Sequence, residues 1–289
     1  MKKTGLISLI ITLLITSCND DEFYSDIKNG GVWMKMGDGM IVGTSDIDYY
    51  DASTYKFYLK RDLPYLKKIE QGGSLSVFVD NTEIYKCTFY PSFSSAYPTG
   101  VYISSSPLFY PEFLLSIETN IIPDPRNDDR IIEALKKYDQ YHEGLFFEIQ
   151  SVSKSNGKVI MNAELYNPDI FDYYYLDPDK MGMGLFHYFT NGLSFYDSNN
   201  NSYTNQETVT RPEPWNSWNK EWLSLIKSGE RKKISLVYNN FEKMLPGNYR
   251  ASFSFPGLTN QIKQKELLQQ DSGRIWLGQL FVTKDVVID

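Results

Sequence analysis

The clearest pattern in this chain is an alternation of apolar and polar residues in its second half. Every second residue of the segment 159–165 is apolar, and the same period recurs over residues 234–238 and 249–255. A period of two places successive side chains on opposite faces of a strand, so each segment predicts a strand with one buried face. Turn-forming residues such as 197–201 separate these segments, and a last strand is expected over residues 275–283. The second half therefore predicts an antiparallel β-sandwich.

The first half mixes short strands with helices. Residues 74–79 and 83–90 are strand-like and are joined by a short polar turn, which predicts a hairpin. Residues 127–138 carry apolar side chains every three or four positions, as a helix with one buried face does, and Asn127 is its expected N-cap. A shorter helix is expected over residues 63–70. Further strands are expected over residues 56–59, 101–104 and 113–117.

The first 22 residues carry a third pattern. Lys2 and Lys3 precede an apolar run over residues 6–15, which is shorter than the roughly 20 residues that a membrane-spanning helix needs. A short positive segment followed by such a run is typical of a secretory signal peptide. Cys18 comes soon after the run, and residues 20–22 are acidic.

Ile15, Ser17 and Cys18 stand at the diagnostic positions of a lipobox, and this segment resembles that of bacterial lipoproteins. The resemblance implies cleavage after residue 17 and acyl chains on Cys18 that anchor the protein to a membrane. The acidic residues 20–22 are similar to the export signal of Bacteroidetes surface lipoproteins, which implies an outer-membrane protein exposed at the cell surface. The alternatives are a periplasm-facing anchor with a solvated acidic tether, or an ordinary signal peptide.

These patterns divide the chain into four parts. Residues 1–17 are the expected signal peptide, and residues 18–31 are a lipidated acidic tether. Residues 32–143 are expected to form an α+β domain, and residues 144–289 an all-β Ig-like antiparallel sandwich. The Ig-like assignment depends on the resemblance described next.

Two resemblances support this division. Residues 46–47, 57–59, 75–80 and 83–85 resemble the strand–helix–strand–turn pattern in the head of the periplasmic part of the SecD translocase subunit. Residues 225–236, the Pro246-Gly247-x-Tyr249 turn and Trp276-x-Gly278 resemble Ig-like sandwiches of bacterial secreted proteins. Examples are the sandwich of deuterolysin-type metalloproteases and those of bacterial proteinase inhibitors. Both resemblances imply a fold, and sandwiches of this kind host many functions.

Composition narrows the function. The chain has 289 residues, 15% aromatic residues and a net charge of −7, which does not fit a basic nucleic-acid-binding surface. It contains two cysteines, so a lipidated Cys18 would leave Cys87 without a disulfide partner. Cys87 lies in a strand-like run and is expected to pack as a small core residue.

Motifs for catalysis are mostly missing from the sequence. The two histidines, His142 and His187, do not form the His-Glu-x-x-His motif of zinc proteases, and no Gly-x-Ser-x-Gly nucleophile elbow occurs. His187 is expected to be a packed strand residue. The acidic segments 46–48 and 124–129 lack the spacing of a calcium loop and are interpreted as turns or a helix start. We therefore assign no catalytic residue and expect neither a cofactor nor a metal site.

Trp215, Trp218 and Trp222 form the most suggestive surface, with spacings that place them on one face of a short helix. Such a stripe would contact a ligand such as a sugar, or a partner protein. The alternative is a helix that plugs one end of the sandwich, because Leu225 and Ile226 continue the same stripe.

The sequence thus predicts a lipid-anchored surface protein with a non-catalytic binding or accessory role, whose partner is a surface protein complex or a glycan. One alternative is a carbohydrate-binding protein of a glycan-uptake system. Another is a hydrolase with a pair of carboxylates between the two domains, since a glycosidase needs two carboxyl groups about 5 to 9.5 Å apart.

Overall fold

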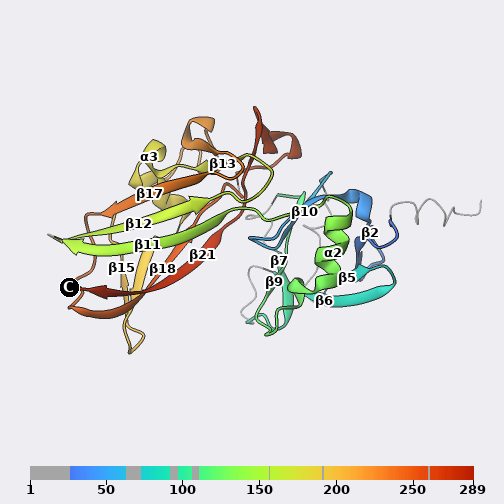
Figure 1. Ribbon diagram of the computed structural model, residues 1–289, viewed down its shortest axis with the longest axis horizontal. Coiled ribbons are helices and arrows are strands. Elements are labelled where there is room, and N and C mark those ends of the chain that lie inside the picture. The colour runs from blue at the N-terminus through green and yellow to red at the C-terminus, as the bar shows by residue number, and fades with distance from the viewer. Residues whose placement is uncertain are drawn as a thin grey trace, which may run out of the picture.

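The computed structural model describes residues 27–62, 73–91, 97–105, 111–155, 157–190, 192–259 and 261–289. Over these residues the protein is mostly β, with five sheets and a few short helices. The signal peptide, Cys18 and the helix expected at 63–70 lie outside the described residues. Figure 1 shows two groups of elements: one ends at β10 (Tyr141–His142), the other begins at β11 (Phe146–Ser155), and the C-terminus lies far from the first group.

The largest sheet belongs to the first group and has the strand order β2-β1-β5-β6-β7-β9. Neighbouring strands are antiparallel, except that β6 and β7 are parallel. The β5–β6 pair confirms the predicted hairpin, and Cys87 in β6 is buried and free. The strands are β1 (Val32–Met36), β2 (Ile41–Val42), β5 (Ser74–Val79), β6 (Thr82–Pro91), β7 (Val101–Ser105) and β9 (Glu118–Thr119).

A second sheet of the first group has the order β10-β3-β4-β8, with β10 parallel to β3. Its other strands are β3 (Ile47–Asp51), which follows the 3-10 helix η1 (Thr44–Asp46), β4 (Lys56–Leu59) and β8 (Leu114–Ser116). Helix α2 (Asp129–Lys137) buries Ile131, Ala134 and Leu135 in the apolar core that the two sheets share. This amphipathic helix and the short strands of this group confirm the sequence pattern.

The N-cap of α2 is Asp128 rather than Asn127, so the prediction of the cap was wrong. Residues Pro125–Asn127 form a separate 3-10 helix, η3, and α2 begins after it. The Asp128 carboxylate accepts a hydrogen bond from the Arg130 amide at 3.0 Å. A carboxylate at this position satisfies a free amide and interacts favourably with the helix dipole.

The second group contains three sheets. Strands β11, β12 (Lys158–Tyr166) and β17 (Arg231–Tyr238) form one antiparallel sheet. The order β15-β14-β18-β21 forms another, from β14 (Leu193–Tyr196), β15 (Ser202–Thr204), β18 (Gly247–Phe255) and β21 (Leu280–Ile288). Four short strands form the third, in the order β16-β13-β20-β19: β13 (Tyr173–Leu176), β16 (Leu223–Ile226), β19 (Gln269–Gln270) and β20 (Gly273–Ile275).

The alternating segments bury the faces that the sequence predicted. Alternate residues of β12, β17 and β18 are buried in one apolar core. Phe147 of β11 stacks on Phe255 of β18, with ring centroids 4.7 Å apart, so the inner faces of two sheets meet there. The same core includes Tyr49 and Tyr58 of the first group. Apolar packing therefore continues across the expected boundary at residues 143–144.

Two further expectations were wrong. His187 lies in helix α4 (Met183–Phe189), which follows α3 (Pro178–Met181), and not in a strand. The aromatic and apolar residues around it fill nearly every position, so they define neither period. The expected last strand is split into β20 and β21. Gly278 lies between them, where the chain passes from the sheet of β20 to the sheet of β21. An added Cβ there would be 2.3 Å from the Trp276 ring, so this passage leaves no room for a side chain.

Candidate functional site

The three tryptophans do not form the expected helical stripe. Residues 214–219 form turns and irregular chain, and a 3-10 helix, η4 (Lys220–Trp222), leads directly into β16. The prediction was wrong because β16 pairs with β13 as a strand, which takes Leu225 and Ile226 out of any helix. Trp218 and Trp222 are partly buried against the core, whereas Trp215 is 41% exposed. The rings therefore share no helical face.

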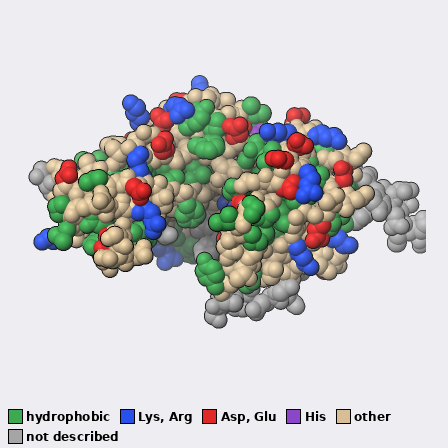
Figure 2. Space-filling view, turned by 60° about the horizontal axis from the view of Figure 1, so that its bottom comes forward, with side chains coloured by type: hydrophobic (Ala, Val, Ile, Leu, Met, Phe, Trp, Pro, Cys, Tyr) green, Lys and Arg blue, Asp and Glu red, His purple; other side chains and the backbone are tan. Residues whose placement is uncertain are grey.

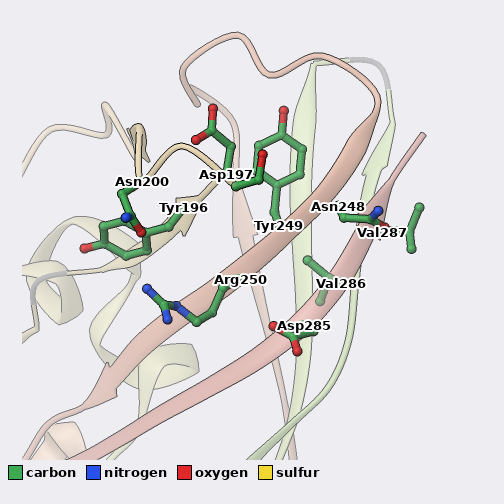
Figure 3. A pocket seen from close by; sticks show the side chains of 10 residues that line it. Tyr196, Asp197, Asn200, Asn248, Tyr249, Arg250, Asp285, Val286 and Val287 are labelled. Atoms are coloured by element: carbon green, nitrogen blue, oxygen red, sulfur yellow. The ribbon is translucent and has the colours of Figure 1, made fainter.

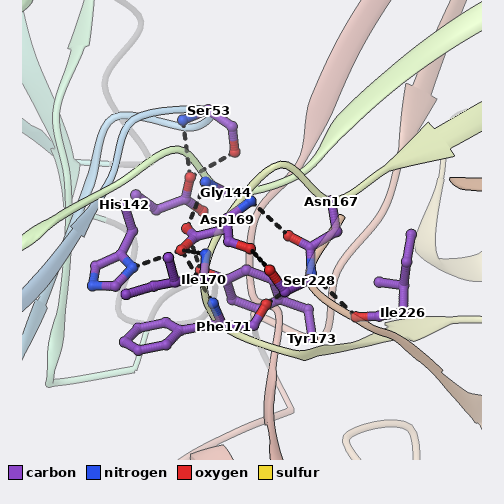
Figure 4. A network of polar contacts seen from close by, with 11 residues as sticks. Ser53, His142, Gly144, Asn167, Asp169, Ile170, Phe171, Tyr173, Ile226 and Ser228 are labelled. Atoms are coloured by element: carbon purple, nitrogen blue, oxygen red, sulfur yellow. Dashed lines mark hydrogen bonds and ion pairs between the residues drawn. The ribbon is translucent and has the colours of Figure 1, made fainter. Parts of the chain in front are cut away.

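His142 is part of a buried polar network between the two groups of elements (Figure 4). Its Nδ1 atom lies 2.8 Å from Oδ1 of Asp169, and both side chains are at most 4% exposed. Asp169 also accepts hydrogen bonds from the Tyr173 hydroxyl at 3.1 Å and from the Gly144 amide at 2.9 Å. Burial alone would raise the pKa of Asp169, but the hydrogen bonds from His142 and Gly144 outweigh it and hold that pKa below its usual range.

Asp51 is the second buried carboxylate of this region. Its Oδ2 accepts a hydrogen bond from Nε1 of Trp276 at 3.1 Å, and its Oδ1 accepts from the amide and the hydroxyl of Ser53 at 2.9 and 2.6 Å. Burial raises the pKa of Asp51 despite these hydrogen bonds. Asp51, His142, Asp169, Tyr173 and Trp276 are called the junction network below, because Asp51 and His142 belong to the first group and the others to the second.

Gly144 is the backbone position that brings the two carboxylates of the junction network together. Its amide donates to Asp169, and a Cβ added to it would lie 2.2 Å from Oδ1 of Asp51. Its φ of +73° is also one that residues with a Cβ rarely adopt. The junction network therefore requires glycine at this position.

An ion cluster extends the junction towards the surface. The Asp48 carboxylate lies 2.6 Å from Nζ of Lys265 and 3.0 Å from the Arg274 guanidinium. Arg274 lies 4.2 Å from the centroid of the Phe171 ring, which itself stacks on His142 at 3.8 Å. The ionisable groups at the junction are thus held by hydrogen bonds, ion pairs and ring contacts, which is typical of a polar network with a structural role.

His187 is also a buried structural residue. Its Nδ1 lies 3.2 Å from the Asn205 amide nitrogen, and its ring stacks on Tyr238 at 5.2 Å. Its Nε2 is buried and has no hydrogen-bond partner among the described residues. Burial lowers the pKa of His187, because a charged imidazole would lose its hydration there.

An open pocket of about 580 Å³ lies on the outer face of the β15-β14-β18-β21 sheet (Figure 3), and its lining includes no residue of the junction network. Tyr196 ends β14, Arg250 belongs to β18 and Asp285 belongs to β21. The strand register places Tyr196 opposite Arg250, and Arg250 opposite Asp285, so the three residues form one row across the sheet. The remaining side chains of the lining come from the turn after β14 and from the ends of β18 and β21: Asp197, Ser198, Asn200, Asn248, Tyr249, Val286 and Val287.

Arg250 is the cation of this pocket, and its side chain approaches an aromatic ring. Figure 3 shows the Arg250 side chain pointing towards Tyr196, and its guanidinium lies 5.6 Å from the centroid of that ring. Although Asp285 faces Arg250 across the strands, no ion pair joins them among the described contacts. The pocket therefore presents a guanidinium, a carboxylate and a partly exposed aromatic ring on neighbouring strands.

The turn that borders the pocket is firmly held. Oδ1 of Asp197 accepts hydrogen bonds from the amides of Asn199 and Asn201, both at 2.9 Å, and Oδ2 accepts from the Asn201 side chain at 2.8 Å. The hydrogen bonds from Asn201 lower the pKa of Asp197 from its usual value. Asn200 adopts a positive φ of 61°, which asparagine tolerates in turns.

A second concavity, of about 320 Å³, lies on the outer face of the other large sheet of this group and includes Phe146, Glu148 and Glu164. Arg231 occupies part of it, because its guanidinium lies 3.8 Å from the centroid of the Tyr166 ring and 2.5 Å from Glu164. Elsewhere, apolar and charged side chains of both signs are interspersed on the face that Figure 2 shows. Such a mixed surface does not by itself mark an interface.

Comparisons with known proteins add no assignment. No known family model matches this chain. No curated protein is significantly similar to it either. In the part of the chain that the structure describes, no three His, Cys, Asp or Glu side chains gather as a metal site would require, and no helix there is long and apolar enough to cross a membrane. The junction network and the open pocket are therefore the two features that bear on function.

Sequence reasoning did not find the pocket on the outer face of β14, β18 and β21. The alternation of β18 marked Arg250 as outward-facing, and the turn after Tyr196 was recognised, but Tyr196, Arg250 and Asp285 are up to 89 positions apart in the chain. Only the pairing register of three strands brings them into one row. No short hairpin turn joins any two of these strands, and such a turn is the local feature that would have fixed their register.

Proposed function

We propose that this protein is a lipid-anchored lipoprotein of the outer membrane, exposed at the cell surface, with a non-catalytic binding or accessory role. In this proposal Cys18 carries the lipid, residues 18–31 form the tether, and an α+β domain precedes an Ig-like sandwich from residue 144. The stacked inner faces of β11 and β18 support the sandwich part of this proposal.

The observation that supports the non-catalytic role is the burial and hydrogen bonding of the junction carboxylates. Asp51 and Asp169 are the two carboxylates of the junction network. Both are almost fully buried, and their oxygens already accept hydrogen bonds from Trp276, Ser53, Tyr173 and backbone amides. A catalytic carboxyl group must reach a substrate atom at hydrogen-bonding distance. Groups saturated inside the protein serve to hold the two parts together instead.

A carbohydrate-binding role in a glycan-uptake system is the second candidate. The pocket formed by Tyr196, Arg250 and Asp285 supports it, because the pocket is open and combines hydrogen-bonding groups with an aromatic ring. The three tryptophans of the sequence-based version support it less, since Trp218 and Trp222 pack against the core.

Membrane fractionation tests the anchor. The full chain is expected in the membrane fraction, and Cys18→Ala is expected to move it to the soluble fraction. Cys87→Ala is the matched control, because Cys87 is a buried free thiol in β6 that would remain irrelevant to anchoring. Retention of the Cys18→Ala variant in the membrane would contradict the anchor.

The non-catalytic role is tested by incubating the full chain, purified in non-ionic detergent, with polysaccharides and measuring reducing ends. No release above a heat-treated sample is expected. Steady release by the purified protein would overturn the non-catalytic proposal and favour the hydrolase.

A further inference from the structure

The pocket on the outer face of β14, β18 and β21 presents a mixed set of groups to a ligand. It is lined by one guanidinium, two carboxylates, two side-chain amides, one serine hydroxyl, two tyrosines and two valines. One carboxylate, that of Asp197, already accepts four hydrogen bonds from its own turn and from Tyr203. The Tyr249 hydroxyl donates to the Leu245 carbonyl. The polar side chains left for a ligand are therefore Arg250, Asp285, Ser198, Asn200 and Asn248, beside the Tyr196 ring.

This set of groups disfavours ions. An anion such as phosphate would be attracted by Arg250 and repelled by Asp285 on the neighbouring strand. A cation would experience the reverse. A purely apolar ligand would leave five polar side chains desolvated without partners, at a cost of about 1–3 kcal/mol for each buried group. Compared with these three classes, a neutral ligand with many hydrogen-bonding groups fits the pocket better.

The Tyr196 ring indicates which kind of neutral ligand fits the pocket. A tyrosine offers a flat apolar face together with a polar hydroxyl. A sugar ring matches this, because its C–H face packs on an aromatic ring while its hydroxyls both donate and accept. Asp285 and the amide oxygens accept from such hydroxyls, and Arg250 and the amide nitrogens donate to them. Arg250 already lies 5.6 Å from the Tyr196 ring, so donor and platform belong to one place.

The site is also preorganised and open. Its side chains project from three paired strands and from a turn fixed by Asp197, so little ordering is needed on binding. A pocket of about 580 Å³ that is open to solvent accommodates one or two sugar rings while the rest of a longer chain extends beyond it.

We infer that the outer face of β14, β18 and β21 is a binding site for a neutral oligosaccharide, with Tyr196 as the stacking platform and Arg250 and Asp285 as the hydrogen-bonding pair. This inference rests on the proposed binding role and adds to its carbohydrate-binding form the neutral charge of the ligand and the part that each side chain plays.

Affinity gel electrophoresis of the full chain in non-ionic detergent tests the site. The probes are soluble starch, arabinoxylan, galactomannan, dextran and yeast mannan, with polygalacturonate as an anionic comparison. At least one neutral polysaccharide is expected to retard the protein. Tyr196→Ala and Asp285→Ala are each expected to weaken that retardation at least tenfold, expressed as a dissociation constant. Tyr97→Ala is the matched control, since it removes an exposed tyrosine ring outside the pocket, and it is expected to bind normally.

The outcomes separate the inference from the proposed function. Retardation by polygalacturonate alone, or by none of the probes, would overturn the ligand class. Retardation that survives Tyr196→Ala and Asp285→Ala, or that is lost with Tyr97→Ala, would overturn the site and leave the binding role intact. Release of reducing ends from the retarding polysaccharide would overturn the non-catalytic role and leave the site intact. Near-ultraviolet circular dichroism confirms that each variant is folded.

Discussion

Gly144→Ala should destabilise the protein more than an ordinary glycine substitution, because Gly144 contacts both carboxylates of the junction network. Its φ of +73° would cost an alanine about 1–2 kcal/mol. The added Cβ would lie 2.2 Å from Oδ1 of Asp51, so the carboxylate must move. A buried acceptor that loses a hydrogen bond costs about 1–3 kcal/mol. Together these effects predict a loss of about 2–5 kcal/mol in the free energy of unfolding.

Gly229→Ala provides the matched control. Gly229 has nearly the same φ, +74°, but an added Cβ there meets no atom within 4 Å. This variant should therefore lose only the conformational part, about 1–2 kcal/mol. The assay is urea unfolding followed by tryptophan fluorescence, with the free energy obtained by linear extrapolation.

The difference between the two alanine variants measures the packing of the junction network. A gap of about 1–3 kcal/mol in favour of Gly229→Ala is expected. Equal losses in the two variants would refute the reasoning, since they would mean that Asp51 yields at no cost. A change in slope rather than in midpoint would indicate that the two groups of elements have begun to unfold separately.

Three further predictions follow from buried and capping groups. Burial lowers the pKa of His187, so its contribution to stability is complete above the unfolded-state pKa of about 6.5 and is lost as the pH falls through that value towards the lower native pKa. His187→Gln should therefore make the thermal midpoint less dependent on pH between pH 7.5 and 5. An equally strong pH dependence of the midpoint in this variant would argue against the prediction. Asp128→Ala should cost about 0.5–2 kcal/mol in urea unfolding, whereas Asn127→Ala should cost little, and the reverse order would restore Asn127 as the cap. Met161→Ala, at a fully buried position of β12, should cost about 2–5 kcal/mol in the same assay, and a loss below 1 kcal/mol would mean that the core there is loosely packed.

The strands were predictable where one face is buried and the other is wet. Buried and exposed residues alternate along β12 and β17, so a period of two is visible in their sequences. It was absent around His187, where nearly every residue is aromatic or apolar and a short helix forms instead. The spacing of Trp215, Trp218 and Trp222 equals that of one helical face, but these residues do not form a helix. Pairing between β16 and β13, which no local spacing reports, decided the outcome.

The candidate site was less predictable than the fold. The sequence identified His142 and an abundance of carboxylates, but not that Asp169 would lie 2.8 Å from His142 or that Gly144 would have to be a glycine. Both facts depend on how the two groups of elements meet. The pocket at Tyr196 depends similarly on the register of β14, β18 and β21. Contacts between residues far apart in the chain are set by tertiary packing, which a single sequence does not display.

The hydrogen bond between Trp276 and Asp51 also bears on how the chain acquires its structure. It joins residues 225 positions apart, and closing a flexible loop of that length costs about 5 kcal/mol in chain entropy. During synthesis Asp51 leaves the ribosome long before Trp276 does, so the Asp51 side chain in β3 stays hydrated until Trp276 is available. Contacts of such long range form slowly. Shortening the chain before residue 276 would therefore leave the earlier half with an aromatic, acidic face open to solvent, a form prone to aggregation and proteolysis.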